Sequence, residues 1–342
     1  MARINASDGR RRGAGWCGVS ASDISGRHRR DAATLEHAAL FYDDDEQLAR
    51  GVVDHVRAGL EADDAVVVAL PDAHLSLVRD ALGDDAHAVL LQDVRRLGLN
   101  PARLLPALHG FLDGLPGRRV RAVGEALWPD RPADERAAYL QTDALTNVAF
   151  ADRPVTMLCP YDTRLLDGDG IADARALHPL VVEDGSPVPN ASFGDPLKLA
   201  EAVLGPLPEA PEEGETLVFR PPHGPRTVRR AVAEHAAEAG MTPDRVTDFC
   251  LAVHEVALNT VVHTEGPGIL SLWHTDDRMV AEIQDSGYIG DPLVGRHPPG
   301  PTDGRGYGLY LTHHLCDLVR LHSTPDGGTT VRMTMYLDGP HR

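Results

Sequence analysis

Short apolar runs in the first part of the chain alternate with segments that have the apolar periodicity of a helix. The runs lie at residues 38–42, 65–70, 87–92, 119–126 and 154–162. The segment 46–62, which separates the first two runs, places apolar residues on one helical face. Apolar runs separated by helices are typical of a mainly parallel sheet that helices cover. We therefore predict an α/β domain over residues 36–205.

The pattern changes in the second part of the chain. A helical stretch at residues 196–205 is followed by residues 206–214, where Pro, Gly and Glu crowd together without an apolar face, which indicates a linker. The pattern then predicts a strand, two helices and three strands, at residues 216–219, 227–239, 243–263, 269–275, 279–285 and 329–337. This order is typical of an α+β domain with helices on one face of an antiparallel sheet, which we place at residues 215–340.

Length and charge narrow the class of protein. The 342 residues are enough for two domains, each with its own core. Residues 1–35 carry several arginines among Gly and Ser without an apolar segment, so we predict a disordered extension and no secretion signal. The net charge of -18 argues against direct nucleic-acid binding, and no apolar run is long enough to span a membrane. We expect a cytoplasmic protein whose partner is a protein or a small molecule.

The four cysteines, Cys17, Cys159, Cys250 and Cys316, are far apart and form no CxxC pair. Their spacing suggests neither a zinc site nor a redox dithiol, and it fits a reducing compartment. Cys159 lies in an apolar run, where burial raises the pKa of a thiol and hides the sulfur, so a redox sensor is not the preferred interpretation.

One face of the predicted helix 243–263 carries three polar side chains. Glu255, Asn259 and His263 are spaced by four residues, and each such step advances only about 40° around a helix. The apolar residues of this helix fall on the opposite side. Taken alone, such a Glu and Asn pair is more often a solvated helix face than a site.

Three segments that follow this helix supply groups suited to a nucleotide. A strand ends in Asp and Gly at residues 285–287, where a carboxylate can accept from an adenine amino group and glycine lets the base approach the backbone. Glycines at positions 304, 306 and 308 precede a helix, whose first N–H groups can bind phosphate. Residues 327–330, GGTT, then open the last strand.

The order and spacing of these four segments resemble the N, G1, G2 and G3 boxes of the histidine kinase-like (GHKL) ATPases. The resemblance implies binding of ATP with Mg²⁺. It makes Glu255 the catalytic carboxylate and Asn259 the Mg²⁺ ligand; an amide oxygen suits this hard cation, and a carboxylate can orient or deprotonate a hydroxyl. The remaining roles are an adenine contact for Asp285 and Gly287, a water-assisted adenine contact for Thr329, and phosphate contacts for Gly304, Arg305, Gly306 and Gly308.

Within that superfamily the domain resembles the anti-sigma-factor serine kinases, because we find neither a transducer domain nor the two-helix hairpin of a sensor histidine kinase. The resemblance implies a sigma factor and an anti-sigma antagonist protein as partners, and phosphorylation of Ser or Thr on the antagonist. His235, the candidate phosphoacceptor of a sensor kinase, is interpreted as a surface or packing residue. His263 is either the histidine that these kinases often carry or a locally bonded residue at a helix end.

A non-catalytic, nucleotide-dependent binding module stays open as an alternative, and so does a homodimer. Gly290 follows Gly287 by three positions, whereas the common pattern has a second glycine after two positions. This departure from the pattern favours the binding module.

The first domain resembles the MEDS family, a sensory domain of methanogen and methylotroph regulators, at residues 37–48, 123–131 and 158–162. No GxxxxGK[ST] motif occurs, so we expect this domain to sense or to act as a scaffold. Several polar residues near predicted strand ends suggest a small-molecule signal site, although packing explains them as well. These residues are His37, Tyr42, Glu125, Trp128, Cys159, Tyr161 and Asp162.

Overall fold

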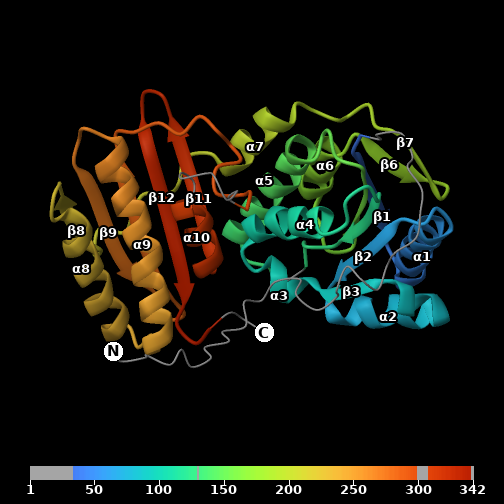
Figure 1. Ribbon diagram of the computed structural model, residues 1–342, viewed down its shortest axis with the longest axis horizontal. Helices are drawn as coiled ribbons and strands as arrows, with labels where there is room; N and C mark the ends of the chain where they lie inside the picture. Colours follow the sequence, from blue (N-terminus) through green and yellow to red (C-terminus); the bar gives the residue numbers. More distant parts are fainter. Residues whose placement is uncertain (1–33, 129–130, 299–306, 340–342) are drawn as a thin grey trace, which may run out of the picture.

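The computed structural model describes residues 34–128, 131–298 and 307–339. A seven-stranded sheet is built from the first part of the chain, and a five-stranded sheet from the second part. The two sheets, each with its own helices, lie side by side (Figure 1). We call them the N-terminal and C-terminal domains. The predicted disordered extension lies outside the described residues, except for residues 34 and 35.

The seven-stranded sheet has the order β3-β2-β4-β5-β1-β6-β7, and its neighbouring strands are parallel except for the pair of β6 and β7. Its strands are β1 (Glu36–Tyr42), β2 (Ala65–Leu70), β3 (Leu90–Asp93), β4 (Val120–Gly124), β5 (Val155–Asp162), β6 (Leu180–Glu183) and β7 (Ser186–Pro189). The five predicted apolar runs overlap β1 to β5, which confirms the mainly parallel α/β sheet. The hairpin of β6 and β7 was not predicted.

Helices cover both faces of this sheet. They are α1 (Asp45–Glu61), α2 (Asp72–Leu82), α3 (Val94–Gly98), α4 (Leu104–Asp113), α5 (Ala133–Ala149), α6 (Gly168–Leu177) and α7 (Pro196–Leu204), with 3-10 helices η2 (Gly83–Ala88) and η3 (Pro101–Arg103). Every residue of β2 is buried, so this strand needs cover on both sides. Val52 and Val78 pack on one face, and Leu105 and Leu145 belong to the core on the other.

The five-stranded sheet is antiparallel, with the order β11-β12-β10-β9-β8. Its strands are β8 (Glu215–Phe219), β9 (Gly268–His274), β10 (Arg278–Asp285), β11 (Leu318–Thr324) and β12 (Gly328–Tyr336), and its helices are α8 (Gly224–Glu238), α9 (Pro243–His263) and α10 (Tyr307–Leu315). The helices share one core with the sheet, built around Val232, Phe249 and Met333. The predicted α+β architecture is therefore confirmed.

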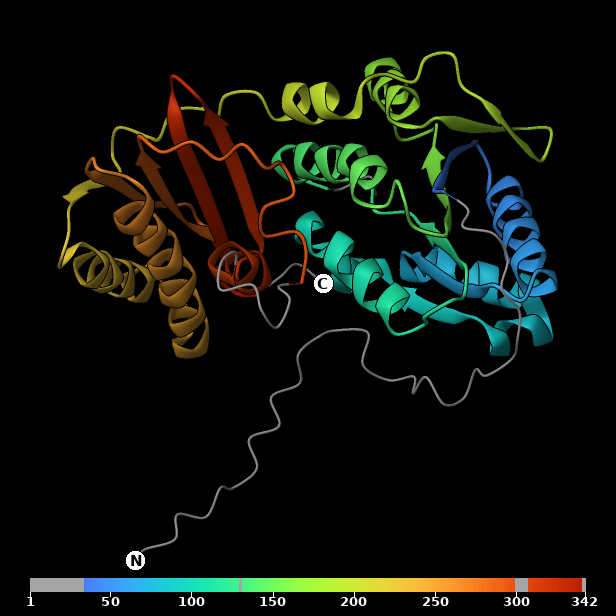
Figure 2. The ribbon, with the colours of Figure 1, turned by 45° about the horizontal axis from the view of Figure 1, so that its top comes forward.

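The two domains touch along α5, η3 and α10 (Figure 2). Asn100 Nδ2 and Arg103 Nε each donate a hydrogen bond of 2.9 Å to the carbonyl oxygen of His313, in the last turn of α10. From the other side, Tyr336 of β12 donates its hydroxyl hydrogen to Glu135 of α5. These contacts hold the ends of α10 and β12 against the N-terminal domain.

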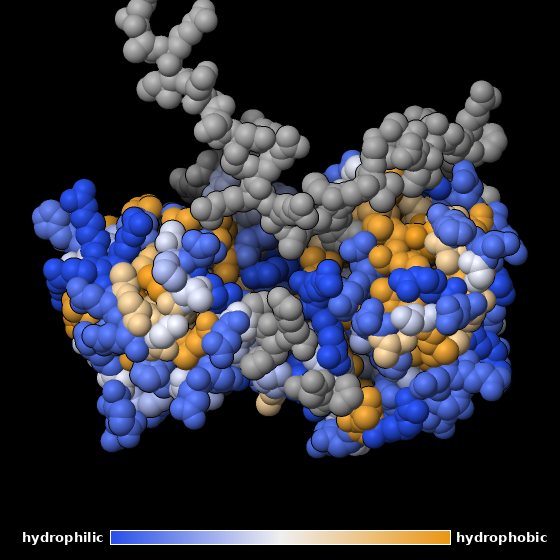
Figure 3. Space-filling view, turned by 90° about the horizontal axis from the view of Figure 1, so that it is seen from below, coloured by the Kyte–Doolittle hydropathy of each residue, from blue (hydrophilic) through white to orange (hydrophobic). Residues whose placement is uncertain are grey.

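Within residues 34–128, 131–298 and 307–339, no helix combines the length and the apolar character needed to cross a membrane. Polar residues cover most of the face seen from below, and apolar patches lie over both domains (Figure 3).

Candidate functional site

The central helix of the C-terminal domain presents the predicted polar residues on its uncovered side. α9 starts at Pro243, a residue that suits the first helical position because its missing N–H has no partner there. Phe249 and Val253 of α9 are fully buried in the core. Glu255 and Asn259 are half-buried, and His263 is exposed in the last turn.

Glu255 and Asn259 meet the first turn of α10 at a glycine. A Cβ atom on Gly308 would lie 3.1 Å from Glu255 Oε2 and 3.5 Å from Asn259 Oδ1. The absence of a side chain at Gly308 therefore lets the first turn of α10 approach the carboxylate and the amide closely. The structure brings these three predicted residues together at the start of a helix, where backbone N–H groups favour an anion.

Asp285, at the end of β10, is held from two sides. The Thr260 hydroxyl of α9 donates to Asp285 Oδ2 over 2.6 Å, and the backbone N–H of Gly287 donates to Oδ1 over 2.8 Å. A carboxylate offers about four acceptor positions, so these two bonds fix the side chain and still leave lone pairs for a ligand. Sequence reasoning missed Thr260, because a hydroxyl on the buried side of a helix carries no pattern of its own.

Thr329 of β12 stands opposite Asp285 in the sheet register. Its hydroxyl donates to the carbonyl oxygen of Gly287 over 2.9 Å and lies 2.7 Å from Ser323 Oγ. Ser323 Oγ in turn accepts the backbone N–H of Ile289 over 2.9 Å. Asp285, Gly287 and Thr329 therefore form one connected network, to which sequence reasoning had not assigned Ser323.

Two glycines permit close packing of backbone in this network. A Cβ on Gly287 would lie 2.9 Å from Thr264 Cγ2, and a Cβ on Gly328 would lie 2.2 Å from the carbonyl oxygen of Asp285. Gly328 also has φ of +76°, a conformation that side chains rarely adopt. Gly290, the displaced glycine, lies against the ring of Tyr288. Gly304, Arg305 and Gly306 lie outside the described residues.

These residues fit a nucleotide with a hard cation. Asp285 keeps free acceptor positions, and the start of α10 at Gly308 lies against an amide oxygen and a carboxylate. Oxygen ligands of this kind are the ones that Mg²⁺ prefers. The roles that the sequence assigned to individual residues remain predictions.

Comparison with known proteins assigns both domains. Residues 222–335 match the family described as the histidine kinase-like ATPase domain, and residues 36–179 match MEDS, the methanogen/methylotroph DcmR sensory domain. The anti-sigma F factor of Caldanaerobacter subterraneus subsp. tengcongensis is 30% identical over 118 residues, which cover 32% of this chain and 82% of that protein. The chain belongs to the histidine kinase-like ATPases of the anti-sigma-factor family, with an added MEDS domain.

Two further anti-sigma F factors agree with this assignment of the ATPase domain. The anti-sigma F factor of Bacillus subtilis is 29% identical over 119 residues, which cover 82% of that protein. The anti-sigma F factor of Pasteuria penetrans is 31% identical over 120 residues, which cover 80% of that protein. Each match spans 32% of this chain. The solved RsbU and RsbW domains of Rv1364c from Mycobacterium tuberculosis match with 22% identity and a TM-score of 0.29, over 37% of this chain and 33% of that one.

His235, set aside as a phosphoacceptor, is tied into the ATPase domain. Its Nδ1 lies 2.9 Å from the carbonyl oxygen of Ala231, and its Nε2 lies 2.9 Å from Glu215 Oε2. Both ring nitrogens therefore have partners between α8 and β8, in agreement with the packing interpretation.

The candidate ligand residues of the MEDS domain separate into two groups. Near the carboxyl ends of the strands, the Tyr42 hydroxyl donates to Glu125 Oε1 over 2.5 Å, and His74 Nδ1 lies 2.7 Å from Glu125 Oε2. Glu125, Trp128 and Asp162 line a pocket here. The other predicted residues, His37, Cys159 and Tyr161, are buried on the far side of β1 and β5, around Asp143 of α5.

Proposed function

We propose that this protein is an anti-sigma regulator that binds Mg-ATP in its ATPase domain, binds a sigma factor, and phosphorylates a Ser or Thr of an anti-sigma antagonist. One observation carries the proposal. The carboxylate of Glu255 and the amide of Asn259 flank Gly308 at the start of α10, while the network of Asp285 and Thr329 is built at the neighbouring strand ends. The similarity to anti-sigma F factors supports the choice of partners.

Each side chain has a distinct task in this proposal. Bound Mg-ATP supplies the phosphoryl group that passes to the hydroxyl of the antagonist. Asp285 accepts a hydrogen bond from the adenine amino group, and Asn259 offers its amide oxygen to the metal ion. Glu255 orients the incoming hydroxyl and takes its proton, since a positioned carboxylate is a suitable general base.

The MEDS domain is proposed to regulate the ATPase domain through the segment 291–298, which follows the adenine contact. Arg296 is 6% exposed, and its guanidinium donates to Thr142 Oγ1 of α5 over 2.9 Å and to the Gln141 side chain. Leu293 packs against the core of the MEDS domain, and the rings of His297 and His109 lie 4.3 Å apart. A change in α5 would therefore reach the chain that connects the adenine contact to α10.

The rival function is a binding module that holds nucleotide without transferring phosphate. The displaced Gly290 favours this rival, because the spacing of the glycines after Asp285 departs from the common pattern. The position of Glu255 beside Gly308 favours the kinase, because nucleotide binding alone does not require a carboxylate next to the metal ligand.

Replacing Glu255 separates the two functions. Glu255→Ala is expected to keep ATP affinity and to lose phosphate transfer by about 10²- to 10⁴-fold, the usual effect of a positioned general base. Asn259→Ala is expected instead to weaken the Mg²⁺-dependent part of ATP binding, since it removes a metal ligand. The measurements are calorimetric titration with ATP in the presence and absence of Mg²⁺, and a radiolabelled phosphate assay on the antagonist protein of the same organism.

The matched control is Glu234→Ala on α8, which removes an exposed glutamate whose side chain is 64% accessible. Transfer at the wild-type rate by Glu255→Ala would exclude Glu255 as the catalytic carboxylate. If the wild type binds ATP but transfers no phosphate, the binding module becomes the function. If it binds no ATP, both functions are wrong.

A further inference from the structure

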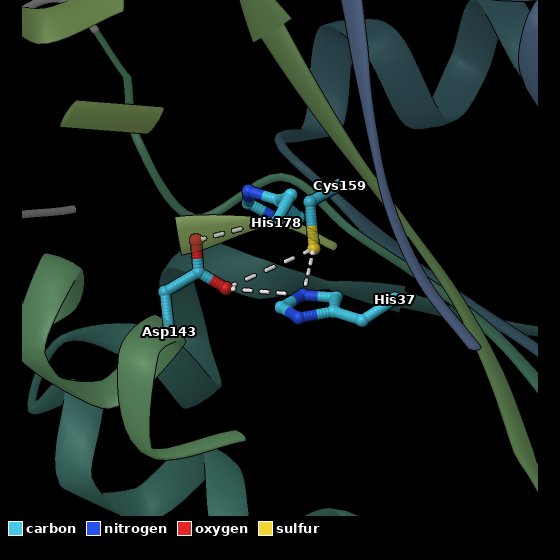
Figure 4. A group of neighbouring side chains, drawn as sticks. All are labelled: His37, Asp143, Cys159 and His178. Carbon is cyan, nitrogen blue, oxygen red and sulfur yellow. Dashed lines mark hydrogen bonds and ion pairs between the residues drawn. The ribbon is translucent and has the colours of Figure 1, made fainter. Parts of the chain in front are cut away.

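Four side chains from distant parts of the MEDS domain converge at one buried point (Figure 4). They are His37 of β1, Asp143 of α5, Cys159 of β5 and His178, which follows α6. All four are buried, and one potential ligand atom from each lies within 4.8 Å of the others. Two histidines, a thiol and a carboxylate are the groups that bind zinc in proteins.

The hydrogen bonds of His178 direct an unprotonated nitrogen to this point. Its Nδ1 lies 2.7 Å from the carbonyl oxygen of Ala174, an acceptor, so Nδ1 carries the proton. In a neutral imidazole whose Nδ1 donates, the other ring nitrogen carries no proton. Nε2 therefore bears a lone pair; it is fully buried, it has no hydrogen-bond partner, and it lies 3.6 Å from Asp143 Oδ2.

His37 is oriented in the same way. Asn147 donates its amide hydrogens to the carbonyl oxygens of Leu177 and Ala144, which leaves Asn147 Oδ1 to accept from His37 Nδ1 over 3.1 Å. His37 Nε2 then carries the lone pair and lies 3.3 Å from both Cys159 Sγ and Asp143 Oδ1. Two nitrogen lone pairs and a carboxylate thus face one another around a single thiol.

We propose that His37, Asp143, Cys159 and His178 form a binding site for a zinc ion. In a tetrahedral site with arms of about 2.0 to 2.3 Å, ligand atoms are about 3.3 to 3.7 Å apart. The separations of 3.3 Å from His37 Nε2 and of 4.0 Å between Cys159 Sγ and Asp143 Oδ1 are close to this spacing. The ion binds the thiolate, and the thiol proton passes to solvent.

The groups behind the four ligands are those that tune a metal site. Tyr161 donates its hydroxyl hydrogen to Asp143 Oδ2, which leaves Oδ1 for the ion. Asn147 and the carbonyl oxygen of Ala174 fix the two imidazoles. Such outer contacts orient ligands and raise their basicity.

The site also adjoins a cavity and the contact with the second domain. Asp143 and Cys159 line an apolar cavity. Asp143 directly follows Thr142, which accepts a hydrogen bond from Arg296. This inference does not depend on the proposed kinase function.

The test uses the full chain, stripped with a chelator and then titrated with Zn²⁺ or Co²⁺ in competition with a chromophoric chelator. One equivalent of either ion is expected to bind, and Co²⁺ is expected to give the near-ultraviolet absorption of a thiolate ligand. Cys159→Ser should lose this absorption, and His178→Gln should weaken zinc binding by at least about 10- to 100-fold, the effect of disturbing even the outer shell. Cys250→Ser, at a buried cysteine of the ATPase domain, is the control and should bind as the wild type does.

Circular dichroism and thermal unfolding of each stripped variant show whether it is folded. If the wild type binds no stoichiometric zinc or cobalt, the site does not exist, and the cluster is a hydrogen-bonded part of the core. If Cys159→Ser and His178→Gln bind zinc as tightly as the wild type, the ion binds elsewhere and the assignment is overturned.

Discussion

At the scale of single residues, Asp285 is oriented before any ligand arrives. Its two oxygens accept hydrogen bonds from Thr260 of α9 and from the backbone N–H of Gly287. A carboxylate fixed in this way binds a ligand without a further loss of side-chain entropy. In the proposed function, the hydroxyl of Thr260 therefore supports the adenine contact by orienting Asp285.

Replacing Asp285 by alanine is expected to lower ATP affinity. The change leaves the adenine amino group without its acceptor, which costs about 1 to 3 kcal/mol, or about 5- to 150-fold in Kd. Calorimetric titration measures the loss. Thr260→Val is the companion variant, since it frees the Asp285 side chain and keeps its carboxylate, and its effect should be smaller. Equal ATP affinity of the wild type and Asp285→Ala would exclude Asp285 as the adenine contact.

Sequence reasoning placed several of these residues in one region because each belongs to a segment with a chemical signature. Glu255 and Asn259 share a helical face. Asp285 is the last residue of β10, and it pairs in register with Thr329, the second residue of β12. Thr260 and Ser323 could not be recognised, because a single hydroxyl shows its partner only in three dimensions.

At the scale of elements, α5 contacts both a buried cluster and the second domain. Asp143 belongs to the proposed zinc site, Thr142 and Gln141 bind Arg296, and Glu135 accepts from Tyr336. A rotation of this helix would therefore change the cluster and the contacts to the ATPase domain together.

Arg296→Ala tests the link between α5 and the segment 291–298. Burial lowers the pKa of Arg296 to about 10, so the side chain stays charged at neutral pH and its hydrogen bonds are of the strong, charge-assisted kind. Their loss should weaken the docking by about 1.5 to 3 kcal/mol. Amide hydrogen exchange should then speed up in residues 291–298 and near Gln141 of α5.

Arg230→Ala on α8, where the side chain is 74% exposed, provides the matched control and should leave exchange unchanged. Unaltered protection of residues 291–298 in Arg296→Ala would mean that other contacts, such as those of Leu293 and His297, hold this segment in place.

The elements that sequence reasoning found are those with a clear apolar period. α9 begins and ends at the predicted residues, and β10 differs by one residue at its start. β11 was missed because it is an edge strand, which carries Arg320 and His322 among half-buried residues. The hairpin of β6 and β7 was missed for the same reason, since its outer strand is mostly exposed.

At the scale of the whole molecule, two separate cores are joined by an interface that contains several hydrogen bonds. The core of the ATPase domain is built from its own residues, among them Phe249, Leu270 and Met333. Asn100 and Arg103 of the MEDS domain add hydrogen bonds to carbonyl oxygens at the end of α10, where a helix favours cationic and donor groups.

Residues 213–342 alone are expected to fold and to bind ATP, because every described residue that we assign to the nucleotide lies within them. The fragment should unfold at a lower temperature than the ATPase domain of the full chain, because it lacks the partners of His313, Cys316 and Tyr336. Calorimetric titration and thermal unfolding measure both effects. A folded fragment that binds no ATP would show that the proposed division at residues 206–214 is wrong.

The interface could not be predicted from the sequence. Asn100 and Arg103 recognise backbone carbonyl oxygens, which every residue has, so no pattern of side chains marks their partners. Each domain could be recognised from the periodicity of its own apolar residues. The contact between the domains depends on the surface that each one has after folding.

The long sequence separation across this interface sets an order of events during synthesis. Asn100 and His313 are 213 residues apart, and Glu135 and Tyr336 are 201 residues apart. At about 5 to 20 residues per second, a ribosome takes about 10 to 40 s to cover that distance. The MEDS domain therefore has time to complete its core on the nascent chain, and its α5 surface meets water until the ATPase domain emerges and docks.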